Sequence, residues 1–297
     1  HAAAMSGPAF AALVGGSAAG GPGVAKEKRD RSRSPCRLPS EGAAGAARVG
    51  GPDPHQDAIG LFVQNAFSCL PERTLVNMFR CLSSLAADNG GAVTVGTLCS
   101  GTDVGVLCVE ALCGRLSLLY AEDKNAPLKV VHAFSCEIDP NKVSWIQQNF
   151  SVPLIFADVE TMGGQSAAES ISGECRAIPS CTVLLAGFSC KSVSSKNNNS
   201  TKFTSCIRDL GNCAVDASSA SAGEEDLGTT GRTWQGVLAY VDRHRPPVIM
   251  LENVKTLLRK SDAGGNNADQ CVDLLRRRGY VANYVVASPH EVGVPCM

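Results

Sequence analysis

The chain has 297 residues, of which 44% are hydrophobic, so it can bury the core of one large α/β domain or of two small ones. Its fourteen cysteines include no Cys-x-x-Cys pair, and the chain is too long for a disulfide-stapled mini-domain, which favours reduced thiols in a cytosolic or nuclear protein. The usual zinc patterns are missing, and no apolar run approaches the ~20 residues of a membrane span.

Charge divides the chain into two parts. Residues 1–50 carry seven Lys or Arg and three Asp or Glu, and the remainder holds 20 basic and 25 acidic residues. Residues 1–56, rich in Ala, Gly and Ser, are therefore predicted to form a disordered basic tail. The basic cluster Lys26–Arg37 suggests import into the nucleus or contact with nucleic acid, although a merely solvated tail fits equally well.

Residues 57–297 are predicted to form one domain in which strands and helices alternate. Leu75, Met78, Phe79 and Leu82 recur at helical spacing after Pro71. Repeated strand–helix units predict an α/β fold with a doubly wound, mostly parallel sheet, interrupted by long polar loops at 162–180 and 192–233. The predicted strands are Val93–Ser100, Val130–Asp139, Pro153–Val159, Thr182–Cys190, Pro247–Val254 and Tyr280–Ala287.

The fourth predicted strand runs directly into Gly187-Phe188-Ser189-Cys190. An apolar run of this kind is typical of a strand buried on both faces of a parallel sheet, and its carboxyl end is where such sheets bind ligands. Cys190 is therefore a candidate nucleophile, although free cysteines are often small hydrophobic residues of a core.

Other polar residues follow the neighbouring strands. Gly101 and Gly105 lie in the first turn, where glycine lets the backbone approach a ligand at the start of a helix. The turn lacks the Gly-x-Gly-x-x-Gly pattern, which disfavours an NAD-dependent enzyme. Glu137 and Asp158 follow the second and third strands, where acids favour a bound nucleoside but also serve as helix caps.

Glu252 ends the otherwise apolar fifth strand, and an acid in that setting must be paired or functional. If the fourth and fifth strands are neighbours, Glu252 lies near Cys190. The two side chains would then form a pair of a thiol nucleophile and a carboxyl that donates a proton.

In their order and spacing, these segments resemble the catalytic domain of the cytosine-C5 DNA methyltransferase family. The resemblance covers about residues 93–295 and implies a Rossmann-like, S-adenosylmethionine-dependent methyltransferase fold. The matching segments are Ser100–Gly105, Glu137–Asp139, Asp158-Val159, Gly187–Cys190, Glu252–Val254 and Gly293–Pro295.

The resemblance also implies roles for single residues. S-adenosyl-L-methionine would be the cofactor, with Glu137 on its ribose and Asp158 on its adenine amino group, while Gly101 and Gly105 admit its methionine part. Ser100 and Ile138 would complete the cofactor site. Cys190 would add to C6 of a cytosine flipped out of DNA, and Glu252 would hold and protonate N3. No metal is implied.

The chain departs from the family pattern at several points. Ser189-Cys190-Lys191 stands where the family has Pro-Cys-Gln, and Cys99 replaces an aromatic residue of the cofactor turn. The arginine-bearing motif and the target-recognition region do not occur before Met297, so the domain is expected to be incomplete at its C-terminus. An RNA cytosine-C5 methyltransferase, and a degenerate member that only binds the cofactor or a chromatin partner, stay open as alternatives.

Overall fold

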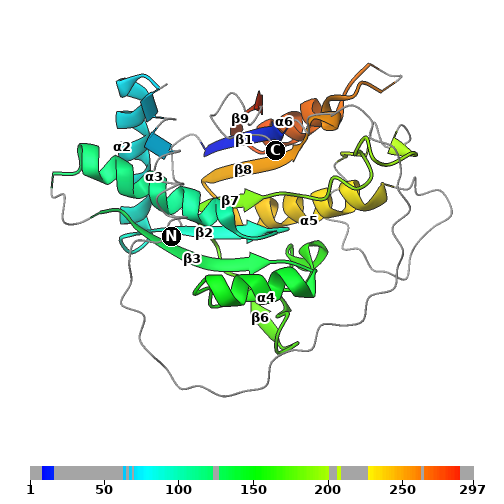
Figure 1. The fold of residues 1–297 in the computed structure, drawn as a ribbon, viewed down its shortest axis with the longest axis horizontal. Coiled ribbons are helices and arrows are strands. Elements are labelled where there is room, and N and C mark those ends of the chain that lie inside the picture. Colours follow the sequence, from blue (N-terminus) through cyan, green and yellow to red (C-terminus); the bar gives the residue numbers. More distant parts are fainter. Residues whose placement is uncertain are drawn as a thin grey trace, which may run out of the picture.

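The computed structural model describes residues 9–16, 63–64, 67–68, 70–122, 127–200, 206–208, 227–261 and 264–287. Within them, seven strands form one parallel sheet in the order β4-β3-β2-β7-β8-β1-β9 (Figure 1). The strands are β1 Ala9–Gly16, β2 Ala92–Leu98, β3 Lys129–Cys136, β4 Ile155–Phe156, β7 Val183–Ala186, β8 Val248–Val254 and β9 Tyr280–Ala287. The predicted α/β fold with a parallel sheet is confirmed.

Helices connect the strands and cover both faces of the sheet. They are α2 Glu72–Asp88, α3 Val104–Tyr120, α4 Pro140–Asn149, α5 Gly228–His244 and α6 Asn267–Arg277, with short 3₁₀ turns η1 Val159–Thr161 and η3 Lys255–Leu258. The apolar spacing that predicts a helix after Pro71 corresponds to α2, which buries Leu75 and Leu82.

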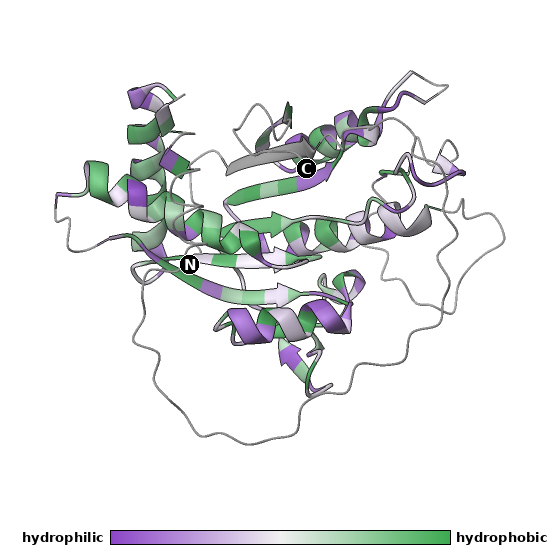
Figure 2. Cartoon of the chain, in the orientation of Figure 1, coloured by the Kyte–Doolittle hydropathy of each residue, from purple (hydrophilic) through white to green (hydrophobic). Residues whose placement is uncertain are grey.

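Two large apolar clusters form most of the core of the described residues, and a smaller third cluster joins α4 to β4. The first joins α5 and α6 to the strands and contains the fully buried Trp234 and Phe134. The second joins α2 and α3 to Val93 and Val95 of β2. Figure 2 shows hydrophobic residues along β7, β8 and α3, as a sheet enclosed by helices requires. No helix in the described ranges is long and apolar enough to cross a membrane.

The structure differs from the sequence prediction in two segments. The predicted loop 162–180 contains an antiparallel hairpin of β5 Ser166–Ala168 and β6 Cys175–Ala177. Within the segment 1–56, predicted to be disordered, residues 9–16 form β1, whose uncharged Ala-, Leu- and Val-containing stretch suits a strand between two others. The rest of that tail lies outside the described residues, and the domain boundary at residue 57 stays a prediction.

The second predicted loop, 192–233, is only partly described. α5 begins at Gly228, so the helix takes over the last residues of that loop. The predicted motif Gly293–Pro295 lies outside the described residues, as does the basic cluster Lys26–Arg37.

Candidate active site

The chain changes its winding direction at β2. This strand pairs with β3 on one side and with β7 on the other, so the connections of the two halves run in opposite directions. Open parallel sheets bind ligands at the carboxyl ends of the strands beside such a switch point. The Gly187 amide donates to the Leu98 carbonyl at 3.2 Å. The predicted cofactor turn and the predicted nucleophile segment therefore leave the sheet side by side.

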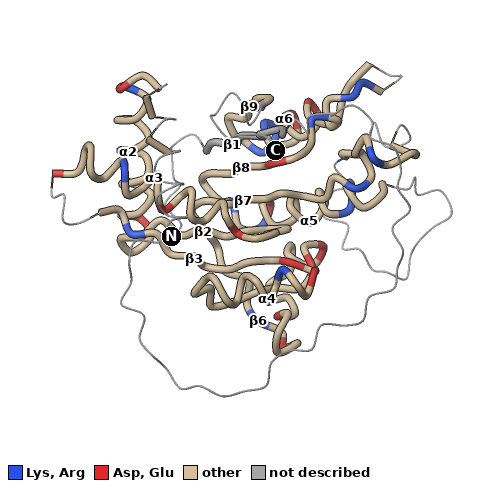
Figure 3. Tube along the Cα trace, viewed as in Figure 1, with Lys and Arg blue, Asp and Glu red and all other residues tan. Residues whose placement is uncertain are grey.

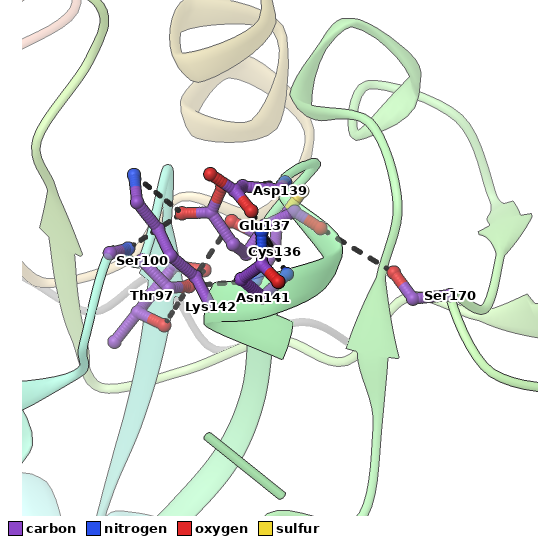
Figure 4. A network of polar contacts seen from close by, with 9 residues as sticks. Thr97, Ser100, Cys136, Glu137, Asp139, Asn141, Lys142 and Ser170 are labelled. Atoms are coloured by element: carbon purple, nitrogen blue, oxygen red, sulfur yellow. Dashed lines mark hydrogen bonds and ion pairs between the residues drawn. The ribbon is translucent and has the colours of Figure 1, made fainter. Parts of the chain in front are cut away.

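The turn after β2 is held against the end of β3 by Ser100 (Figure 4). The Ser100 amide donates to the Cys136 carbonyl at 3.0 Å, and the Cys136 amide donates to Ser100 Oγ at 2.9 Å. Ser100 Oγ also lies 2.6 Å from Thr97 Oγ1. The Ser100 hydroxyl thus fixes the turn, and its predicted contact with a cofactor stays a prediction.

Glu137 connects the same turn to the start of α4. Its carboxylate accepts from the Gly101 amide at 2.8 Å and from the Asp139 amide at 2.9 Å, and Lys142 Nζ lies 3.8 Å away. The side chain is 5% exposed, whereas Ile138 beside it is 77% exposed. Each carboxylate oxygen has two lone-pair positions, so Glu137 keeps acceptor capacity for a further donor.

These features fit a nucleoside cofactor. Glu137 offers a carboxylate, and Ile138 offers an open apolar surface next to it. A Cβ built at Gly101, where φ is +63°, meets no atom within 4 Å, so the space over the turn is open. Acidic residues concentrate where β3 ends and α4 begins (Figure 3). Among the described residues, no group of His, Cys, Asp and Glu could hold a metal ion.

Asp158 and Gly105 have structural roles in the fold, and the sequence pattern alone could not distinguish these roles from cofactor binding. Asp158 Oδ1 accepts from the Glu160 amide at 2.9 Å and so caps η1. A Cβ at Gly105 would lie 2.9 Å from Leu185 Cδ1, so a larger residue there would displace the Leu185 side chain where α3 packs on β7. Their predicted contacts with the cofactor stay predictions.

The nucleophile segment is held by hydroxyl groups of α5. The Ser189 amide donates to Thr233 Oγ1 at 3.1 Å, and the Ser192 amide donates to Thr230 Oγ1 at 3.2 Å. The Thr230 amide donates back to Ser192 Oγ at 3.3 Å, which closes a reciprocal pair. Cys190 is half-buried between these two anchors. Because proline has no amide hydrogen, the Ser189 bond to Thr233 is available only with a non-proline residue before the cysteine.

Of the thiols at this edge, Cys99 is unsuited to nucleophilic chemistry. Burial raises the pKa of the Cys99 thiol to about 12, and the charges of Glu137 and Asp158 add to the rise. The protonated thiol is a poor nucleophile. Cys190 is therefore the better candidate of the two.

Glu252 lies beside the nucleophile segment, as the strand order predicted. A Cβ at Gly187 would lie 3.6 Å from Glu252 Oε2 and 3.8 Å from the Cys99 carbonyl oxygen. The side chain is open to solvent on one side, yet loss of water on the other raises the pKa of Glu252 above its usual 4.5. This direction suits a carboxyl that donates a proton.

The structure thus brings all the predicted site residues to one edge of the sheet, and it adds residues that the sequence reasoning missed. Asn253 is 2% exposed and donates from Nδ2 to the Phe188 carbonyl at 2.8 Å, which fixes the strand before Cys190. The sequence could have indicated a role for Asn253, since a side-chain amide on the buried face of a core strand must be hydrogen bonded. The sequence does not single out Thr230 and Thr233, because hydroxyl residues are common at helix starts.

The parallel sheet and its strand order are consistent with the Rossmann-like fold of methyltransferases, and a thiol and a carboxyl lie at the edge where such sheets bind ligands. Residues 215–296 match the family model described as C-5 cytosine-specific DNA methylase. Over this part, which is less than a third of its length, the chain is similar to a family of S-adenosylmethionine-dependent cytosine-C5 methyltransferases.

Two curated relatives are similar to part of this chain. A DNA (cytosine-5-)-methyltransferase DMT5 from Cryptococcus neoformans is 31% identical over 166 residues, which cover 56% of this chain and 6% of the relative. The DMT5 protein of Verticillium dahliae is 29% identical over an alignment that covers 58% of this chain and 8% of the relative. The chain thus spans less than a tenth of the length of either relative.

Proposed function

We propose that this chain carries the catalytic centre of a DNA (cytosine-5)-methyltransferase that acts through a covalent Cys190 adduct. The observation that supports this most directly is the convergence at Gly187. This residue precedes the Cys190 loop, its Cβ position lies 3.6 Å from Glu252 Oε2, and its amide is bonded to the end of β2. The loop that carries Cys190, the Glu252 carboxyl and the turn after β2 therefore lie close together, which supports the roles proposed for them.

The proposed cofactor is S-adenosyl-L-methionine, which supplies the electrophilic methyl group when bound. Glu137 would accept hydrogen bonds from the ribose, Ile138 would pack against the adenine, and Asp158 would accept from the adenine amino group. The remaining members of the proposed site are Ser100, Gly101 and Gly105. The support is the exposed Ile138 surface beside a carboxylate whose oxygens keep free lone pairs.

The proposed chemistry begins with a cytosine outside the base stack. The Cys190 thiolate forms a bond to C6 while Glu252 delivers a proton to N3, so the electrons of the C5–C6 double bond become available at C5. C5 then takes the methyl group, and S-adenosylhomocysteine is the leaving group. Solvent takes the C5 proton, which restores the double bond as the C6–sulfur bond breaks and Cys190 leaves as a thiolate, and N3 returns its proton to Glu252. The raised pKa of Glu252 keeps its proton available closer to neutral pH.

Nucleic acid as substrate is supported by lysines beyond the catalytic strands. Lys191 and Lys196 follow β7, Lys255 and Lys260 follow β8, and all four are exposed. Lysines placed in this way suit the phosphate backbone of a polynucleotide, where neutralising phosphates releases counterions. DNA is proposed as the substrate because the matched family acts on DNA.

The departure from Pro-Cys-Gln does not by itself favour a degenerate, merely binding protein. Ser189 donates its amide hydrogen to Thr233, and Asn253 holds the Phe188 carbonyl. These two hydrogen bonds restrain the backbone before Cys190, as the ring of a proline would. The geometry around Cys190 therefore still supports a catalytic role.

Methyl transfer tests the proposal. The protein is incubated with S-adenosylmethionine carrying a labelled methyl group and with cytosine-containing DNA or RNA, and the nucleosides are then separated. We expect labelled 5-methyldeoxycytidine with the wild-type protein and none with Cys190→Ser. Label in RNA alone would contradict the proposed substrate, and label with Cys190→Ser would remove Cys190 as the nucleophile. Cofactor binding without any transfer would favour the binding-only alternative.

A nuclear location is also proposed, from the basic cluster Lys26–Arg37 alone. A fluorescent reporter fused to residues 1–56 should accumulate in the nucleus. An even distribution of the reporter would contradict the proposal.

A further inference from the structure

Behind the cofactor turn lies a buried polar cluster of Asp103, Ser135 and His132. Asp103 is the N-cap residue of α3 and is 2% exposed, and Ser135 and His132 belong to β3 and are also buried. Ser135 Oγ donates to Asp103 Oδ2 at 2.6 Å and lies 3.1 Å from His132 Nε2. His132 Nε2 is 3.7 Å from the same carboxylate oxygen. The cluster therefore joins the turn to β3.

The hydrogens of this cluster can be assigned. A serine hydroxyl has one hydrogen, and here it points to Asp103, so His132 Nε2 must carry the hydrogen of the His132–Ser135 contact. His132 Nδ1 is then an acceptor, and it has no partner within the described residues. Burial lowers the pKa of His132 to about 4, so the ring is neutral at pH 7. The result is a directed chain from a neutral imidazole through a hydroxyl to a carboxylate.

The turn that this chain holds has an unusual backbone. Cys99, Gly101 and Asp103 all have left-handed φ values, of 53°, 63° and 55°. Outside this turn, Arg245 alone among the described non-glycine residues has such a φ. Left-handed residues other than glycine persist where their surroundings hold them, and they concentrate at functional sites. Asp103 is held by its side chain, through β3.

Two contacts thus link the turn and β3 one above the other. Asp103 accepts from Ser135. Two residues earlier in the turn, the Gly101 amide donates to Glu137, which lies two residues after Ser135. Loss of the Asp103–Ser135 contact would let the turn move relative to Glu137. Glu137 is the carboxylate proposed to bind the ribose, so its orientation depends on where the turn sits.

We propose that Asp103 is a positioning residue of the cofactor site, holding the turn between β2 and α3 in register with Glu137 through Ser135 and His132. The inference rests on the proposed binding of S-adenosylmethionine. It goes beyond the family match, which begins at residue 215. Asp103 itself is buried, so its proposed role acts through the turn and Glu137 and not through a contact with the cofactor.

Three substitutions separate the carboxylate from the backbone conformation. Asp103→Gly removes the carboxylate but makes the left-handed conformation easier to adopt. Asp103→Asn keeps the shape of the side chain and its tolerance of that conformation. Ser135→Ala removes the hydrogen-bond partner. Arg245→Gly is the matched control, because it relieves a left-handed residue at the C-cap of α5, before β8 and so at the other end of the strands.

Binding of S-adenosylmethionine is measured by titration calorimetry on the whole chain at pH 7.5, and thermal unfolding of each variant is recorded alongside. We expect Asp103→Gly to raise the dissociation constant about tenfold, the effect of one lost hydrogen bond to a charged group, without lowering the thermal midpoint. Asp103→Asn keeps an acceptor for the Ser135 hydroxyl and should raise the dissociation constant less. Arg245→Gly should bind like the wild type. In turnover assays of Asp103→Gly the KM for S-adenosylmethionine should rise while the KM for DNA stays unchanged. Adding Ser135→Ala to Asp103→Gly should weaken binding no further, because both remove the same contact.

Wild-type affinity in Asp103→Gly would overturn this inference and leave the proposed function intact. A wild-type protein that does not bind S-adenosylmethionine would overturn the proposed function itself. If Asp103→Gly, Asp103→Asn and Ser135→Ala all fail to fold, the cluster serves stability rather than positioning, and the inference is wrong.

Discussion

Replacing Asp103 by asparagine should change how the stability of the fold depends on pH. Burial raises the pKa of Asp103 to about 6 from its ordinary 3.8, and the charge of Glu137 adds to the rise against the hydrogen bond from Ser135. A raised pKa means that the folded protein holds this proton more tightly than the unfolded chain does. The stability contributed is therefore complete below pH 3.8 and is lost as the pH rises through 6.

The size of the effect follows from the two pKa values. Between pH 5 and pH 8, a carboxyl with these values in the folded and unfolded states loses about 1.4 kcal/mol of folding free energy. Asparagine does not titrate. The stability of Asp103→Asn relative to the wild type should therefore increase by about 1.4 kcal/mol over this range.

His132 acts in the opposite direction. Its pKa falls to about 4 from 6.5, so its contribution to stability is present above pH 6.5 and is lost as the pH falls through 4. Because His132 is present in both proteins, the difference between them isolates Asp103. Urea unfolding of both at pH 5, 6.5 and 8 gives the measurement. A difference that stays constant across these pH values would refute the assignment of Asp103 as a buried carboxyl that resists ionisation.

Further substitutions test single contacts. Glu137→Ala should weaken S-adenosylmethionine binding by about 1.5–3 kcal/mol in calorimetry, the size of a lost charged hydrogen bond, and unchanged affinity would remove Glu137 from the site. Glu252→Gln should slow the covalent step by about 10²–10⁴-fold while cofactor affinity stays the same, and a full rate would show that no proton is delivered from this position. Lys255→Gln and Lys260→Gln should each weaken DNA binding and lower the slope of log affinity against log salt by about 1. An unchanged slope would place DNA elsewhere.

The parts of the fold that repeat a simple pattern could be predicted from the sequence. The helix after Pro71 was confirmed as α2, and the strand Tyr280–Ala287 has the predicted bounds. Long apolar stretches leave little choice of register or face, so their elements follow from local spacing. The hairpin of β5 and β6 was missed because its strands have only three residues each, made of small and polar types that carry no alternation.

In the candidate site, too, some features could be predicted from the sequence and others could not. Cys190 and Glu252 could be placed together because strand ends and strand order determine their position. The Asp103–Ser135 contact could not be predicted, since it joins residues 32 positions apart and no spacing in the sequence indicates it. Gly105 was assigned to the cofactor by its place in the turn, and only the packing on Leu185 reveals a second reason for glycine.

Covalent trapping tests the central claim most directly. DNA containing 5-fluorocytosine blocks the last step, since fluorine at C5 is not lost as a proton is, so a catalytic thiol stays bonded to C6. The protein is incubated with this DNA and S-adenosylmethionine, digested, and the modified peptide is identified by mass spectrometry. The control is Cys175→Ser, which removes an exposed thiol on the β5–β6 hairpin. We expect an adduct on Cys190 in the wild type and in the control, and none in Cys190→Ser. An adduct on another cysteine, or transfer of the methyl group by Cys190→Ser, would contradict it.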